Sequence, residues 1–63
     1  MQWYYKDRTS PDKPFMGPKG PYSEVKIREL IQVRLISSMA MLRPEDSEEW
    51  IPLDQAKEFK AFL

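Results

Sequence analysis

Aromatic side chains gather near the start of the chain, at a spacing that suits a binding surface. Trp3 and Tyr5 lie two positions apart, and Asp7 follows two positions later. Residues at this spacing on a strand point to the same face of a sheet. The segment Gly20-Pro21-Tyr22 can turn a third ring toward them. Stacking of rings and hydrogen bonding by phenol hydroxyls is the chemistry that this group offers, and it is typical of a binding surface.

Catalytic chemistry has few candidate groups in this chain. The sequence has no cysteine and no histidine, so nucleophiles and general bases are limited to Ser, Thr, Lys and carboxylates. The carboxylates do not pair at a recognisable spacing. We therefore expect a protein that is not an enzyme and has no metal, no cofactor and no small-molecule substrate. The lack of cysteine also favours an intracellular location, cytoplasmic or nuclear.

Charge is distributed unevenly along a chain whose formal net charge is zero. Residues 1–43 hold eight Lys or Arg against four Asp or Glu, a net charge of +4. Residues 44–63 hold two against six, a net charge of −4. Nucleic-acid binding normally needs a dominant basic face, so we expect no nucleic-acid partner. No apolar run approaches the roughly 18–20 residues that span a bilayer, so we expect no membrane insertion.

The first half of the chain predicts a strand, a loop and a helix. Residues 3–6 are typical of a short aromatic strand. Residues 7–19 are expected to form a long proline-rich loop, because proline disfavours both a helix and an inner strand. A second short strand or turn is expected near Lys19–Tyr22. Ser23 is a good N-cap for a helix that runs from Glu24 to about Val33, with an apolar stripe formed by Ile27, Leu30 and Ile31.

The second half predicts two more strands and a short helix. Met39–Arg43 is expected to be a strand whose two methionines pack in the core. An acidic turn over residues 44–49 leads to a short edge strand, Trp50–Leu53, since Pro52 cannot donate to a ladder. Asp54 is expected to cap a last short helix, which carries Ala56, Phe59, Phe62 and Leu63. Together these elements predict a single α+β domain over residues 1–63, with a small antiparallel β-sheet packed against one main α-helix.

Three motifs, in this order, resemble the GYF domain family. They are Trp3-Tyr4-Tyr5, Gly20-Pro21-Tyr22 at the entrance to the helix, and Trp50-Ile51-Pro52-Leu53. Asp7 stands where the Smy2-type subclass has aspartate, so that subclass is the nearest. The resemblance covers residues 3–53. It implies an intracellular adaptor that binds proline-rich peptides of the Pro-Pro-Gly-hydrophobic type through an aromatic groove.

The chain departs from the family pattern in the helix and after it. Ile27 and Leu30 stand where the family has methionine and tryptophan, and Arg34-Leu35-Ile36 stands where it has Gly-Tyr-Phe. The loop between Tyr5 and Gly20 is also longer than is typical. In the site that the resemblance implies, tyrosines form the walls, leucines form the floor, and a tryptophan supports or lines the groove. The peptide-binding residues are then Trp3, Tyr5, Asp7, Tyr22, Leu30 and Leu35.

Three alternatives stay open at this point. Both Trp3 and Trp50 are expected in the core, because a small domain needs its largest rings inside. The PxxP spacing in the proline-rich loop also fits a ligand for another domain. Finally, the chain could be a divergent GYF-like docking module that holds a neighbour through residues 45–49 and the last helix, without binding peptides. Tyr5 and Tyr22 exposed side by side would favour peptide binding, and their burial under the loop would favour docking.

Overall fold

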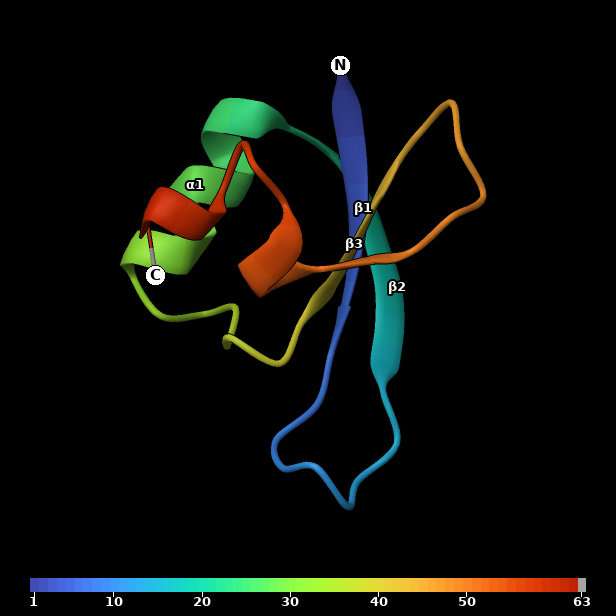
Figure 1. Cartoon of the computed structure of the whole chain (residues 1–63), viewed down its shortest axis with the longest axis vertical. Coiled ribbons are helices and arrows are strands. Elements are labelled where there is room, and N and C mark those ends of the chain that lie inside the picture. The colour runs from blue at the N-terminus through green and yellow to red at the C-terminus, as the bar shows by residue number, and fades with distance from the viewer. Residues whose placement is uncertain (63) are drawn as a thin grey trace.

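A four-stranded antiparallel sheet covered on one face by a helix forms the domain, in a computed structural model that describes residues 1–62 (Figure 1). The strands lie in the order β2-β1-β3-β4. Figure 1 shows α1 and the C-terminal turns on the same side of the sheet. The expected α+β class is confirmed. The elements are β1 (Gln2–Asp7), β2 (Met16–Ser23), α1 (Glu24–Gln32), β3 (Met41–Pro44), β4 (Ile51–Pro52) and two 3-10 turns, Leu53–Gln55 and Lys60–Phe62.

The central strand β1 alternates between the core and the outer face of the sheet. Trp3 and Tyr5 are buried, whereas Tyr4 and Lys6 are half-buried on the other face. Trp3 packs edge-to-face against Phe59, with 5.1 Å between ring centroids, so the C-terminal turns close the core. The core cluster consists of Trp3, Tyr5, Ile27, Ile31, Ile36, Ala40, Leu42, Leu53, Ala56 and Phe59.

The strand β2 is longer than the sequence predicts. The expected loop over residues 7–19 ends at Phe15, and Met16 already pairs with Asp7. Prolines are tolerated here because β2 is an edge strand, where a missing N–H need not cost a ladder hydrogen bond. Each Gly-Pro pair lies at a register shift, one between the partners of Trp3 and Tyr5 and one between those of Tyr5 and Asp7.

Helix α1 begins as predicted and ends in an unusual way. The Ser23 hydroxyl accepts a hydrogen bond from the Lys26 N–H at 3.1 Å, which confirms the N-cap. At the other end Arg34 has φ +63°, a conformation that glycine usually provides. The Arg34 N–H donates to Ile31 at 3.0 Å and the Leu35 N–H donates to Leu30 at 2.9 Å. These two bonds form a Schellman motif, which directs Ile36 into the core.

Several predictions for the second half of the chain are wrong in detail. The core residues of this segment are Ala40 and Leu42, whereas Met39 and Met41 are half-buried. Because side chains alternate along a strand, a prediction that is off by one residue assigns each side chain to the wrong face of the sheet. Trp50 is half-buried on the outer face rather than in the core.

The expected last helix is two 3-10 turns instead, and Asp54 lies inside the first of them and does not cap a helix. Leu63 lies outside the described residues. Within residues 1–62, no helix is both long enough and apolar enough to cross a bilayer.

Candidate functional site

A shallow hollow of about 170 Å³ opens where β1, β2 and the turn after α1 meet. Tyr5 contributes the floor, because its side chain is buried in the core cluster. Met16 and Leu35 lie on the rim, and their side chains are 70% and 69% exposed. Two large apolar side chains held in solvent beside a buried ring would lose water on binding an apolar ligand. The hollow is lined by Tyr5, Asp7, Arg8, Thr9, Met16, Lys19 and Leu35.

Tyr5 and Tyr22 form a ring pair beside the hollow. Their centroids are 5.9 Å apart and their planes are tilted by 32°. Tyr5 is only 9% exposed, whereas Tyr22 is half-buried. Burial is the main cause that raises the pKa of the Tyr5 phenol above its ordinary value of 10.0. Electrostatic repulsion from the neighbouring Tyr22 and Asp7 raises this pKa further. Like any phenol at neutral pH, the hydroxyl is protonated and can donate a hydrogen bond to a ligand carbonyl.

Asp7 fixes the wall of the hollow. Its carboxylate accepts hydrogen bonds from the Ser37 N–H at 2.8 Å and the Ser37 hydroxyl at 2.6 Å. The Arg8 N–H donates to the same carboxylate at 2.8 Å. With three donors already bound, the carboxylate has little capacity left for a ligand. Asp7 therefore positions the turn that carries Leu35.

The structure brings together four of the six residues that the sequence predicts for the site. Tyr5, Asp7 and Leu35 line the hollow, and Tyr22 stacks beside Tyr5. Leu30 is half-buried against the core, and its carbonyl accepts the Leu35 N–H, so it supports the rim from below. Trp3 is 4% exposed and packs on Phe59, which confirms that it belongs to the core.

The chain was compared with models of known protein families, with curated proteins and with solved structures. None of the three comparisons finds a match.

Met16 and Lys19 belong to the site but were missed, because the sequence places them in a loop. A signal for them exists in the three-residue repeat Gly-Pro-x at residues 17–19 and 20–22. Each repeat adds one residue to β2 relative to β1, so the partners of Asp7, Tyr5 and Trp3 are spaced by three. These partners are Met16, Lys19 and Tyr22.

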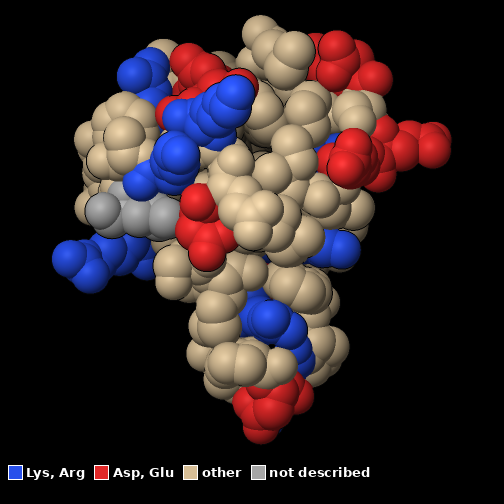
Figure 2. All heavy atoms as spheres, viewed as in Figure 1, with Lys and Arg blue, Asp and Glu red and all other residues tan. Residues whose placement is uncertain are grey.

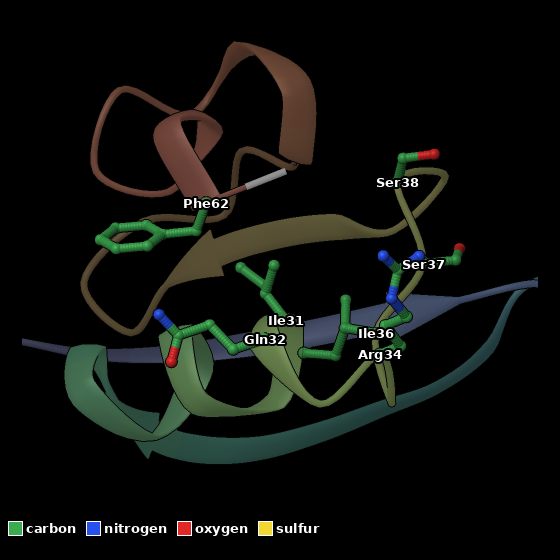
Figure 3. Close-up of a pocket in the computed structure, with 7 residues that line it drawn as sticks. All are labelled: Ile31, Gln32, Arg34, Ile36, Ser37, Ser38 and Phe62. Atoms are coloured by element: carbon green, nitrogen blue, oxygen red, sulfur yellow. The ribbon is translucent and has the colours of Figure 1, made fainter.

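A larger hollow of about 550 Å³ lies between α1 and the C-terminal turn (Figure 3). Figure 3 shows Phe62 of the C-terminal turn above Gln32 and Ile31 of α1. Ser37 and Ser38 lie on the segment that follows the helix. The two isoleucines of this hollow, Ile31 and Ile36, are 5% and 3% exposed. None of the strongly exposed large apolar side chains among the described residues lines this larger hollow, whereas Met16 and Leu35 line the smaller one, so the smaller hollow is the better candidate.

The residues that the structure describes include no cluster of candidate metal ligands. Residues 1–62 contain no group of three or more His, Cys, Asp or Glu side chains that could hold an ion. Asp7, the only carboxylate of the hollow, is bound to Ser37 and Arg8. What the site offers is apolar contact, one ring pair and a phenol donor, which together suit an extended peptide.

Proposed function

We propose that this domain is a GYF-like adaptor that binds a proline-rich segment of another protein in the hollow over Tyr5. The observation that carries the proposal is the exposure of Met16 and Leu35, at 70% and 69%, in a hollow that a buried tyrosine also lines. Proline rings stack on aromatic and apolar side chains, and a polyproline II segment loses little entropy on binding. The Tyr5 phenol, protonated at neutral pH, supplies a donor for a peptide carbonyl.

The turn after α1 also supports this proposal. Arg34 stands where the family has the glycine of Gly-Tyr-Phe, and its φ of +63° is one that glycine adopts readily. Leu35 stands at the tyrosine position and lines the hollow, and Ile36 stands at the phenylalanine position and is 3% exposed. The triplet thus places one aliphatic side chain at the hollow and the next in the core.

The edges of the sheet favour a side-chain groove over strand addition. β2 carries Pro18 and Pro21, and β4 ends with Pro52. Proline removes the N–H that an added strand would need, which blunts an edge. A peptide partner is therefore expected to dock on the rings and on the rim of the hollow.

A titration followed by two-dimensional NMR tests the proposal. A short Pro-Pro-Gly-Leu peptide should give saturable shifts at Tyr5, Met16, Tyr22 and Leu35, with a Kd that is roughly micromolar or weaker because the contact area is small. A peptide with alanine in place of both prolines is the matched ligand control. Equal shifts with both peptides, or none at millimolar concentration, would rule the proposal out.

A docking module without peptide affinity is the alternative. The observation that favours it is the burial of Tyr5, which at 9% exposure leaves little of the ring to a ligand. In that case the acidic segment 45–49 and the C-terminal turns are the surfaces that contact a neighbour. The same titration separates the two functions, because only the adaptor responds to the proline-rich peptide.

A further inference from the structure

The face of the sheet opposite α1 carries alternating cations and aromatic rings. Tyr4 and Lys6 of β1 point to this face, because they alternate with the buried Trp3 and Tyr5. Arg43 of β3 is the cross-strand partner of Tyr4. We call this set the outer strip; along it the side chains follow one another in the order Arg8, Phe15, Lys6, Trp50, Arg43 and Tyr4.

Every neighbouring pair in the outer strip is a cation over a ring. The cation lies 4.6 Å from the ring centroid for Arg8 over Phe15, and 5.1 Å for Lys6 over the same ring. Lys6 also lies 4.5 Å from the Trp50 ring. Arg43 lies 5.5 Å from the Trp50 ring and 4.4 Å from the Tyr4 ring. All five distances are within the range of about 6 Å for cation–π attraction, so the rings hold the cations in place.

The positive charges of the outer strip are not neutralised by these contacts. Arg8 donates to the Pro11 carbonyl and Arg43 donates to the Ser47 carbonyl, and neither acceptor is a carboxylate. The cross-strand partner of Lys6 is Met41, which is uncharged. A guanidinium has five N–H donors and an ammonium has three. Three half-buried positive charges with donors to spare therefore lie on one face of the sheet.

We propose that the outer strip binds an acidic segment of a partner protein. Charge complementarity identifies the partner: carboxylates accept from guanidinium and ammonium groups. Because the rings already restrict the three cations, less side-chain entropy is lost when carboxylates bind. The strip shares Arg8 with the lining of the Tyr5 hollow, but Lys6, Trp50 and Arg43 lie outside that lining, so this inference does not depend on the proposed adaptor function.

The surroundings of the outer strip favour a peptide over a nucleic acid. Each of its three rings already faces a cation, so bases have no bare ring on which to stack. The β3–β4 connection beside Arg43 and Trp50 carries four carboxylates, and Figure 2 shows acidic side chains gathered over this connection. A phosphate backbone, with a charge on every nucleotide, is repelled there. An acidic peptide can place its carboxylates only where the cations lie.

Binding of a capped peptide of alternating glycine and glutamate tests the proposal, with the glutamine version as the ligand control. At low salt the glutamate peptide should shift the Trp50 indole N–H and the Lys6 and Arg43 amides, and 0.5 M NaCl should abolish the shifts through screening. Lys6→Gln should weaken binding roughly two- to fivefold, the range expected for one exposed ion pair. Lys6→Arg, which keeps the charge, should restore it.

Lys26→Gln is the matched control, because Lys26 is an exposed cation on α1, on the other side of the sheet. It should leave the affinity unchanged, and an unchanged dispersion of the free Lys6→Gln spectrum shows that this variant is folded. Equal binding of the glutamine peptide, or the absence of saturable shifts, overturns the proposal. Tighter binding of a single-stranded oligonucleotide of mixed sequence also overturns it, in favour of a nucleic-acid surface.

Discussion

Asp7 and Ser37 join the end of β1 to the segment that follows α1, thirty residues along the chain. The Ser37 N–H donates to one carboxylate oxygen at 2.8 Å, and its hydroxyl donates to the other at 2.6 Å. The same hydroxyl accepts the Met39 N–H at 3.1 Å, which orders the turn into β3. Leu35, on the rim of the hollow, lies two residues before this contact. The pair thereby links the stability of the fold to the geometry of the site.

Asp7→Ala should destabilise the domain by about 1–3 kcal/mol, because it leaves the Ser37 donors half-buried without an acceptor. Urea unfolding measures this loss. Ser37→Ala removes only the hydroxyl and should cost about 1 kcal/mol. Asp12→Ala is the control: this exposed carboxylate accepts from Ser10 and from its own backbone N–H, both within a surface turn. A loss as large for Asp12→Ala as for Asp7→Ala would contradict the role of Asp7.

Gly20→Ala should be among the most damaging exposed substitutions. Gly20 has φ +125°, and a Cβ added there would lie 2.7 Å from the Trp3 carbonyl oxygen. Gly17 has φ +115°, but its nearest contacts would be 3.2 Å away. Strain of this kind costs about 1–3 kcal/mol, and we expect Gly20→Ala near the upper end and Gly17→Ala nearer the lower. Thermal unfolding ranks the two variants, and the reverse order would refute the bulge geometry.

Arg34→Gly should stabilise the domain by about 0.5–1 kcal/mol. A non-glycine residue in the left-handed conformation costs about 1–2 kcal/mol, and part of the gain is offset by the greater freedom of glycine in the unfolded chain. Val33→Gly is the control, because Val33 has φ −88° and gains nothing from glycine. The difference between the two variants in chemical unfolding is the readout. A destabilised Arg34→Gly would show that Arg34 makes contacts worth more than the strain.

Tyr5 should make stability fall at alkaline pH. Its folded-state pKa is raised above 10.0, so the folded chain keeps this proton to a higher pH than the unfolded chain does. Its contribution to stability is therefore complete below pH 10 and is lost as pH rises through the folded pKa. Tyr5→Phe should flatten this dependence in melting curves from pH 8 to 11. All other side chains are the same in the two proteins, so an identical pH dependence would contradict the burial of the Tyr5 phenol.

The elements of the fold follow from local patterns. The alternation of Trp3 and Tyr5 with Tyr4 and Lys6 predicts β1, and Ser23 followed by an apolar stripe predicts α1. The prolines and glycines of residues 16–21 hid the start of β2, because proline argues against a strand unless the strand lies at an edge. Edge position is a property of the whole sheet, so no local pattern reveals it.

The candidate site was predictable in part. Tyr5, Asp7, Tyr22 and Leu35 were expected together, and the hollow and its neighbouring ring pair do join them. Met16 and Lys19 reach the hollow only because two bulges change the period of β2 from two to three. Trp50 was expected in the core, but it lies on the outer face, where Lys6 of β1 and Arg43 of β3 contact its ring. Such cross-strand contacts depend on register, which the sequence of one strand does not specify.

The rim of the hollow offers a matched pair of variants. Leu35→Ser should weaken the binding of a Pro-Pro-Gly-Leu peptide by about tenfold, since burying a leucine contributes about 1.5–2 kcal/mol. Val33→Ser is the control, because Val33 is 59% exposed and does not line the hollow. Calorimetric titration gives both affinities. Equal effects of the two substitutions would show that Leu35 has no specific contact with the peptide.

Intermolecular nuclear Overhauser effects between the labelled domain and an unlabelled Pro-Pro-Gly-Leu peptide locate the bound peptide. If the peptide binds in the hollow over Tyr5, cross-peaks should join the proline ring protons to the Tyr22 ring, the Met16 methyl group and the Leu35 methyl groups. Cross-peaks confined to Tyr4 and Trp50 would place the peptide on the outer strip instead and would contradict binding in the hollow.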